Sequence, residues 1–329
     1  MSTINNKIIV FGTGSKQTEF ENHLSNVEVL FYLDNDKQKR GGVHNNLIVR
    51  LPEDCSLDEL ENNLIVIASS FYSEISEQLE EMGLQENIHF MDMYRFLPID
   101  TVRLMLDVPE DIPNDFFHTI LSCRKYTLTS FERMFSLYQS ISYIVKNNIK
   151  GAIVECGVWK GGSMMLSAYS LISLNATDRN LYLYDTFSGM TAPTEIDTSL
   201  FNENAKQLWL EHDQGWAVGP KEEVIKNMKS TGYPMENIHF IEGKVEETIP
   251  AHIPGSIALL RLDTDWYEST YHELNHLFPI LSPKGILIID DYGHWKGSKI
   301  ATDKYIDENN LALFLHKIDY TARLAVKTV

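Results

Sequence analysis

In the first 98 residues, segments with apolar positions at helical spacing alternate with apolar runs typical of strands. Residues 72–83 place Ile75, Leu79 and Met82 on one face of a helix. The apolar runs with the length and pattern of strands are residues 7–15, 27–36, 62–70 and 86–92. Strands that alternate with helices are typical of βαβ units. The pattern therefore predicts a small α/β domain with a parallel sheet at 1–98.

Residues 99–150 differ from the segments on either side. Prolines at positions 98, 109 and 113 interrupt the start of this stretch. Residues 130–148 then carry apolar side chains at helical spacing, and Ser130 is suited to cap that helix. We interpret 99–150 as a helical connector or lid that packs on the following domain.

The alternation of strands and helices returns at 151–329 and predicts a second α/β domain. Helices or long loops separate the first five of its strands, whereas almost nothing joins the last two. Such a tight connection requires an antiparallel pair. We therefore expect a seven-stranded, mostly parallel sheet with an antiparallel terminal strand. The predicted strands are residues 151–157, 180–187, 237–243, 256–264, 285–291, 311–319 and 321–328.

Composition and charge narrow the class of protein. The 329 residues suffice for two domains, and 43% hydrophobic and 22% charged residues are ordinary for a globular protein. The net charge of −18 argues against a nucleic-acid partner, whose phosphates would be repelled. No apolar run reaches the roughly 18 residues of a membrane span, and the N-terminus does not read as a signal peptide.

The cysteine pattern indicates reduced thiols. Cys55, Cys123 and Cys156 are an odd number and show no CxxC spacing. This argues against a disulfide framework and against a zinc site. We therefore expect a cytoplasmic protein.

A glycine-rich loop, "VECGVWKGGSMM" at 154–165, follows the first strand of the second domain. Glu155 stands at the end of this strand, and Asp185 ends the next strand 30 residues later. Ligands of parallel sheets bind outside these carboxyl ends. Three glycines permit a tight turn and close backbone approach before the helix: Gly157, Gly161 and Gly162.

The spacing of this loop favours S-adenosylmethionine over a dinucleotide. Asp185 can accept hydrogen bonds from both hydroxyls of a ribose. A dinucleotide site would show GxGxxG and an acid about 20 residues on, and this loop shows neither. S-Adenosylmethionine has no pyrophosphate and does not need that fingerprint. The alternative is a generic strand–helix turn whose acids cap helices.

Four carboxylates stand at the ends of two further strands. Asp263 and Asp265 end the apolar part of "LRLDTDWYEST", and Asp290 and Asp291 end that of "ILIIDDYG". Clustered carboxylate oxygens suit Mg²⁺, and without a metal four acids in one cleft would repel each other.

Simpler interpretations of these acids remain open. Asp265 and Glu268 fit a capping box for the helix that follows. Asp290 or Asp291 could satisfy backbone donors of the next loop. His294 could contact a substrate or metal, or be an ordinary polar loop residue.

Residues 120–329 resemble the macrocin O-methyltransferase family, whose members methylate sugar hydroxyls on macrolide and aminocoumarin antibiotics. The matching segments follow the family's order: "YTLTSFERMFSL", "GAIVECGVWKGGSMML", "LYLYDTFSGM", "GKVEETIP", "LRLDTDWYEST" and "ILIIDDYGHWKG". The resemblance implies a class I S-adenosylmethionine-dependent methyltransferase fold that uses S-adenosylmethionine and Mg²⁺. It assigns the metal to Asp263, Asp290 and Asp291, and the role of general base to Asp265.

The same resemblance gives a set of expected cofactor contacts. "GKVEETIP" should lie beside the adenine through Glu246 or Glu247, and Tyr126 and Thr129 of the connector should close over the cofactor. The expected cofactor-binding residues are Glu155, Gly157, Gly161, Gly162, Ser163, Asp185, Glu246, Tyr126 and Thr129.

The N-terminal domain resembles, more weakly, the small Rossmann-like domains of some sugar-modifying enzymes. Gly12 and Gly14 follow a strand, and Asp34 lies 22 residues beyond Gly12, but Gln17 stands where a dinucleotide fingerprint has its third glycine. This domain could bind a nucleotide or nucleotide-sugar, or support oligomerisation or partner docking. We expect a homo-oligomer.

Three functions follow from these observations. The leading one is a Mg²⁺-dependent O-methyltransferase acting on a sugar of an antibiotic, a surface glycan or a nucleotide. A catechol or phenol acceptor is the second, but such enzymes usually have a Lys near the base, where this chain has Trp266 and Tyr267. The third is a non-catalytic nucleotide-binding scaffold, which would not need acids at every strand end.

Overall fold

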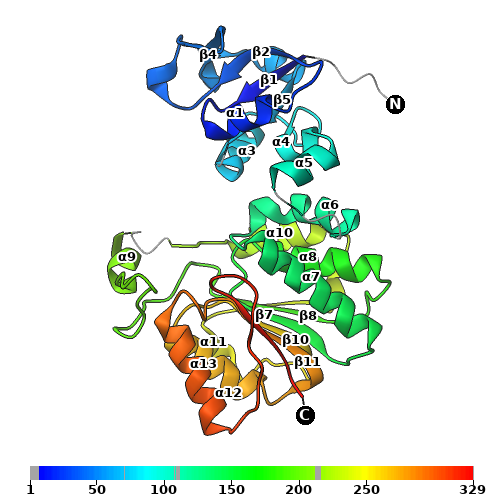
Figure 1. Cartoon of the computed structure of the whole chain (residues 1–329), viewed down its shortest axis with the longest axis vertical. Helices are drawn as coiled ribbons and strands as arrows, with labels where there is room; N and C mark the ends of the chain where they lie inside the picture. Colours follow the sequence, from blue (N-terminus) through cyan, green and yellow to red (C-terminus); the bar gives the residue numbers. More distant parts are fainter. Residues whose placement is uncertain (1–6, 70, 107, 109–111, 212–215, 329) are drawn as a thin grey trace. The chain divides into compact units, whose positions relative to one another are not determined.

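The computed structural model describes residues 7–69, 71–106, 108, 112–211 and 216–328. The chain forms two compact units, residues 1–117 and 118–329 (Figure 1). Their boundary lies inside 99–150, so the segment that we interpret as a connector is shared between the units. No helix of the described residues is long and apolar enough to cross a lipid bilayer.

Unit 1 contains a six-stranded sheet in the order β3-β4-β2-β1-β5-β6. All its strands are parallel except β3, which pairs antiparallel with β4. The sequence pattern missed β3 and β4, which are short and partly exposed. The strands are β1 (Lys7–Phe11), β2 (Glu28–Leu33), β3 (Val43–His44), β4 (Leu47–Arg50), β5 (Leu64–Ile67) and β6 (Phe90–Asp92). The helices are α1 (Ser15–Glu21), α2 (Leu57–Glu61), α3 (Tyr72–Glu81), α4 (Met93–Phe96) and α5 (Ile99–Met105).

Unit 2 contains a seven-stranded sheet in the order β12-β13-β11-β10-β7-β8-β9. The five strands from β11 to β9 pair parallel to one another. The terminal strand β13 pairs antiparallel with β11 and with β12, as the sequence predicts. The strands are β7 (Ala152–Cys156), β8 (Leu181–Asp185), β9 (Ile238–Glu242), β10 (Ile257–Leu262), β11 (Leu281–Ile289), β12 (His316–Lys317) and β13 (Arg323–Val326). The predicted strand at 311–319 is therefore reduced to two exposed residues.

Helices cover both faces of this second sheet. α7, α8 and α10 pack on one face, and α11, α12 and α13 on the other (Figure 1). Every residue of β7 and β10 is consequently buried. The helices are α6 (Asn114–Cys123, across the boundary), α7 (Phe131–Lys146), α8 (Gly162–Ser173), α9 (Ala205–Glu211), α10 (Lys221–Ser230), α11 (Val245–Thr248), α12 (Tyr267–Leu277) and α13 (Lys296–Glu308).

The strand order of unit 2 reverses between β7 and β10. Ligands of open parallel sheets bind in the crevice outside the carboxyl ends of the strands at such a point. The glycine loop follows β7, and Asp263 directly follows β10. The fold therefore brings the expected cofactor loop and the expected metal ligands to the same edge.

Candidate active site

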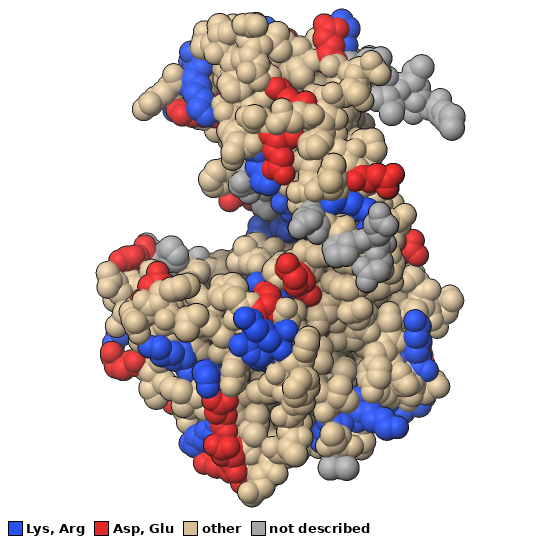
Figure 2. All heavy atoms as spheres, viewed as in Figure 1, with Lys and Arg blue, Asp and Glu red and all other residues tan. Residues whose placement is uncertain are grey.

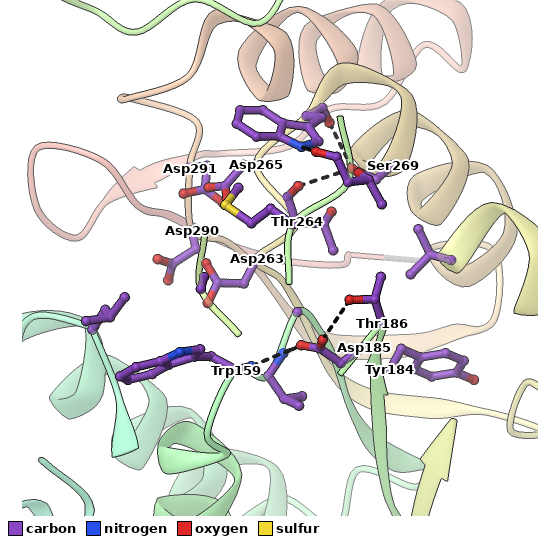
Figure 3. Close-up of a pocket in the computed structure, with 18 of the residues that line it drawn as sticks. Trp159, Tyr184, Asp185, Thr186, Asp263, Thr264, Asp265, Ser269, Asp290 and Asp291 are labelled. Carbon is purple, nitrogen blue, oxygen red and sulfur yellow. Dashed lines mark hydrogen bonds between the residues drawn. The ribbon is translucent and has the colours of Figure 1, made fainter. Parts of the chain in front are cut away.

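A cavity of ≈ 400 Å³ opens at the carboxyl ends of β7, β8, β10 and β11. This volume lies in the usual range of small-molecule sites. Figure 3 shows Asp263, Asp265, Asp290 and Asp291 gathered on one side of it and Asp185 with Trp159 on the other. The site thus has an acidic half and a half built by the glycine loop.

The glycine loop lies directly against the strand end that carries the acids. Gly157 has φ +82°, and a Cβ atom there would lie 2.0 Å from the carbonyl oxygen of Asp263. A Cβ atom on Gly162 would lie 2.6 Å from the carbonyl oxygen of Tyr126. Only glycine permits both approaches, so Gly157 shapes the cavity wall through its backbone, and Gly162 lets the start of α8 pack against Tyr126.

Asp185 organises the loop that it faces. Its carboxylate accepts the amides of Val158 at 2.7 Å, Trp159 at 3.0 Å and Phe187 at 2.7 Å. Burial raises the pKa of Asp185, although these amides oppose the shift. The acid that the sequence assigns to a ribose therefore also fixes the backbone around that position.

The acidic half contains a set of carboxylates that fits a divalent cation. Asp263, Asp290 and Asp291 each offer one oxygen, and these oxygens lie within 4.8 Å of one another. The Asp263 side chain is 25% exposed because it faces the cavity, whereas Asp290 is 1% exposed. Hard oxygen donors at this spacing are the ligand type that Mg²⁺ prefers.

A buried arginine, Arg261, lies behind these acids. Its guanidinium donates to Glu155, to Asp263 at 2.7 Å and to Asp290 at 2.6 Å, and Arg133 of α7 also pairs with Asp290. Although burial opposes ionisation, the two arginines hold the pKa of Asp290 below its ordinary value. Asp290 is therefore charged without a metal.

Glu155 does not line the cavity. It is 2% exposed and pairs with Arg261, its register neighbour on β10. Burial raises its pKa to about 6 despite that arginine. In this structure Glu155, which we expect to contact the cofactor, lies behind the cavity wall and pairs with Arg261.

Asp265 occupies a strained turn. Its φ is +67°, and the Trp266 amide donates to the Thr264 carbonyl at 2.8 Å across it. A bond from residue i+2 to residue i around a positive φ has the features of the rare classic γ-turn. Non-glycine residues in such conformations persist where the surroundings enforce them, frequently at functional sites.

The capping-box interpretation of Asp265 is wrong. α12 begins at Tyr267 with Trp266 as its N-cap residue, and no side chain of that residue caps the helix. Asp197, which is 1% exposed, accepts the Tyr267 amide at 2.9 Å instead. Asp265 is consequently left to face the cavity.

The surroundings of Asp265 raise its pKa to about 7. Burial is the largest cause, and the charge of Asp263 adds to it. Hydrogen bonds from Asp291 and Trp295 favour the ionised form and limit the shift. Burial and Asp265 raise the pKa of Asp291 further, so Asp291 is the donor of this pair in the metal-free protein.

Tryptophans close the cavity beside Asp265. Trp266 and Trp295 are 3% and 5% exposed, with ring centroids 5.1 Å apart, and Trp216 lies 6.1 Å from both. The Trp266 indole donates to the Thr191 carbonyl at 2.9 Å. This wall is apolar and largely buried.

His294 lines the cavity at the same end. Its Nδ1 is buried and has no hydrogen-bond partner within the described part of the chain. Burial lowers the pKa of His294, so the ring is neutral at neutral pH. It can accept or donate one hydrogen bond to a bound molecule.

Most of the predicted site residues line the cavity. The exceptions are Glu155, Gly161, Gly162 and Tyr126. Gly161 is the N-cap residue of α8, and the backbone of Tyr126 packs against Gly162. The predicted residues on the cavity wall are Gly157, Ser163, Asp185, Glu246, Thr129, Asp263, Asp265, Asp290 and Asp291.

Sequence reasoning missed three residues that organise the site. Arg261 carried a signal, because it is a lone cation in the apolar run at 256–262. Arg133 and Asp197 carried none, since nothing local distinguishes them from other polar residues.

In unit 1, Asp34 accepts hydrogen bonds from Thr13 and from Lys39, the latter at 2.9 Å.

Comparison with known proteins decides the family. Residues 121–326, more than half of the chain, match the model described as macrocin-O-methyltransferase (TylF). This chain belongs to the macrocin O-methyltransferase family. It is therefore an S-adenosylmethionine-dependent O-methyltransferase. Residues 4–89 match a separate model, described as C2185-like, N-terminal.

Individual relatives support this assignment. The demethyldecarbamoylnovobiocin O-methyltransferase of Streptomyces niveus is 30% identical over 194 residues, covering 59% of this chain and 72% of the relative. The 8-demethyl-8-(2,3-dimethoxy-alpha-L-rhamnosyl)-tetracenomycin-C 4'-O-methyltransferase of Streptomyces olivaceus is 33% identical over 167 residues, 51% and 62% of the two chains. The structure of the O-methyltransferase NovP is 28% identical with a TM-score of 0.55, covering 62% of this chain and 83% of NovP.

Proposed function

We propose that this O-methyltransferase methylates a sugar hydroxyl in a divalent-metal-dependent reaction with Asp265 as the general base. One observation carries the proposal. The oxygens of Asp263, Asp290 and Asp291 that lie within 4.8 Å of one another share a cavity with a fourth carboxylate, Asp265, and with the glycine loop.

Asp263, Asp290 and Asp291 would hold the metal, for which their oxygen donors are suited. A bound dication lowers the pKa of a coordinated hydroxyl and orients it. Arg261 contacts two of these acids from behind. Burial raises the pKa of Asp263 and the charge of Arg261 opposes that rise, whereas Arg261 and Arg133 together hold the pKa of Asp290 below its ordinary value.

Asp265 would accept the proton of the acceptor hydroxyl. A general base must lie within hydrogen-bond reach of the proton that it takes, and Asp265 lines the same cavity as the three acids that would hold the metal. Trp295 fixes its carboxylate by a hydrogen bond, and the turn at Thr264 and Trp266 directs it. This chain's contribution is therefore mainly positioning of the reacting groups.

The other half of the cavity would bind S-adenosylmethionine, whose sulfonium supplies the methyl group. Asp185 fixes the amides of Val158 and Trp159, and Ser163 and Glu246 lie on the same wall. These residues would hold the ribose, adenine and amino-acid parts.

A sugar acceptor is supported by the relatives and by the wall beside the base. The name of the Streptomyces olivaceus relative specifies a rhamnosyl group on the molecule that it methylates. Trp266, Trp295 and His294 give this end an apolar surface with one polar ring, which suits a sugar with an apolar face and hydroxyls at its edge. The sugar could belong to an antibiotic, a surface glycan or a nucleotide.

The test is a turnover assay with purified full-length protein and S-adenosylmethionine. Acceptors are 4-nitrophenyl α-L-rhamnoside, dTDP-L-rhamnose and catechol, each with Mg²⁺ or with a chelator. We expect S-adenosylhomocysteine and a methylated sugar only with Mg²⁺. Preference for catechol would favour the phenolic alternative, and full turnover with chelator would contradict the metal requirement.

A further inference from the structure

Glu273 is a carboxyl group that the proposed reaction does not use. It lies in α12, is 0% exposed, and its Oε2 has no hydrogen-bond partner among the residues that the structure describes. Burial raises its pKa well above the ordinary value, although hydrogen bonds from Thr264 and from the Cys156 thiol oppose the shift. Burying a polar group is unfavourable unless hydrogen bonds compensate, and the bond from Thr264 is one that does so.

That hydrogen bond leads to the turn around Asp265. The Thr264 hydroxyl donates to Glu273 at 2.9 Å. The Thr264 carbonyl accepts the Trp266 amide at 2.8 Å and the Ser269 hydroxyl at 3.3 Å. Figure 3 shows Thr264 beside Asp265, with Ser269 bonded to it. Thr264 is therefore fixed at its side chain by Glu273 and at its carbonyl by the turn.

We propose that Glu273 is a positioning residue whose hydrogen bond to Thr264 holds the strained turn that presents Asp265. A residue at φ +67° needs such support from its surroundings. The inference rests on the proposed function, because it matters for catalysis only if Asp265 is the base. The simpler alternative is that Glu273 only fills the core, so that replacing it changes stability alone.

Tryptophan signals allow a direct test that needs neither cofactor nor acceptor. The chain has five tryptophans, so ¹⁵N-tryptophan labelling gives few NMR signals. The Trp266 backbone amide closes the turn, and the Trp295 indole reports on Asp265. The Trp159 amide, held by Asp185 at 3.0 Å, is the internal control. Trp266→Phe, Trp295→Phe and Trp159→Phe assign the signals.

The two informative variants are Glu273→Leu, which removes the acceptor, and Glu273→Gln, which keeps an acceptor for Thr264. In Glu273→Leu we expect hydrogen exchange of the Trp266 amide to quicken roughly tenfold relative to Trp159, as for loss of one supporting hydrogen bond. The Trp295 indole signal should also shift. Glu273→Gln should retain the wild-type exchange and signals.

Unchanged Trp266 exchange in Glu273→Leu would overturn the inference, as would an equal disturbance in Glu273→Gln. If Glu273→Leu does not fold, Thr264→Val removes the same hydrogen bond from the other side, and Thr264→Ser is its matched control. Failure to detect methyl transfer by the wild-type protein would instead contradict the proposed function and would leave this structural result standing.

Discussion

Asp263 and Asp265 lie two positions apart in the chain but face different partners. Asp263 belongs to the group of oxygens that fits a metal and accepts a hydrogen bond from Arg261 at 2.7 Å. Asp265 lies in the turn beyond it, where Trp295 and Asp291 contact its carboxylate. The two acids are therefore expected to fail in different ways when they are replaced.

Asp265→Asn should keep metal and cofactor binding but lose the proton acceptor, so we expect kcat to fall about 10²–10⁴-fold. Excess Mg²⁺ should not restore it. The matched control is Asp263→Asn, which should weaken Mg²⁺ binding and be partly restored by excess metal. Turnover and Mg²⁺ titration of both variants check this. Normal turnover of Asp265→Asn would mean that another group takes the proton.

Asp185→Ala should weaken S-adenosylmethionine binding by about 1–3 kcal/mol, because hydrogen bonds to the cofactor and to the loop amides are both lost. Calorimetric titration measures this change. Asp185→Asn is the control, since it keeps one acceptor oxygen for the loop. Unchanged affinity of the alanine variant would remove Asp185 from the binding site.

In the metal-free protein, Asp265 should contribute a loss of stability as the pH rises from about 4 to about 7. The folded-state pKa of Asp265 is raised from 3.8 to about 7, so the folded state binds this proton more tightly than the unfolded state. Its contribution is present below the unfolded pKa and disappears as pH rises through the folded value. Thermal unfolding across this window measures the slope, which Asp265→Asn should reduce. A slope identical in both proteins would contradict the assignment.

At the scale of elements, the loop before α9 supplies the cap of α12, so Asp265 is not needed for capping. Asp197 accepts the Tyr267 amide at the start of α12 and the Thr194 amide at 2.7 Å. The same segment also pairs with the loop that follows Asp290 and Asp291. Ser199 forms an isolated antiparallel β-bridge with Trp295, and the Leu200 amide donates to the His294 carbonyl at 2.7 Å. One loop therefore caps α12 and lies against Trp295 and His294 at one end of the cavity.

Asp197→Ala should lower the free energy of unfolding by about 1–2 kcal/mol, the usual effect of losing an N-cap. It should also reduce turnover, because the start of α12 adjoins the Asp265 turn. Asp197→Asn keeps a capping oxygen and should behave nearly as wild type. Chemical denaturation with parallel turnover measurements checks both variants. Equal stability of alanine variant and wild type would show that the cap is dispensable.

The elements and acids that the sequence predicted share one physical basis. Long apolar runs identify strands, and parallel strands bring their carboxyl ends to one edge, so Asp185, Asp263 and Asp290 could be placed together. The role of Glu155 could not be predicted, because its partner Arg261 is its neighbour only through the β7–β10 register. Strand order and register are tertiary properties that local patterns do not contain.

At the scale of the whole molecule, charge bears on the choice of acceptor. The chain carries a net charge of −18, and Figure 2 shows acidic and basic side chains mixed over the viewed face. A field of this sign opposes the approach of strongly anionic polymers. Among the acceptors that remain open, the overall charge therefore favours neutral sugars over polyanionic glycans.

The division of the chain at 117/118 leads to a prediction about separability. The residues that line the cavity run from Thr127 to Thr321, entirely inside unit 2. A truncated chain that begins at Ile112 keeps α6 whole and retains the hydrophobic core around the second sheet. Since a domain with its own core is able to fold alone, this chain should unfold cooperatively and bind S-adenosylmethionine with nearly the full-length affinity.

Calorimetry and cofactor titration of the truncated chain test this directly, with Asp185→Ala in the same truncated chain as the control whose affinity should fall by about 1–3 kcal/mol. Any change in the acceptor KM would then assign a role in acceptor delivery to unit 1. If the truncated chain is folded yet does not bind the cofactor, unit 1 is required for the site. The prediction that unit 2 alone contains the complete cofactor site would then be wrong.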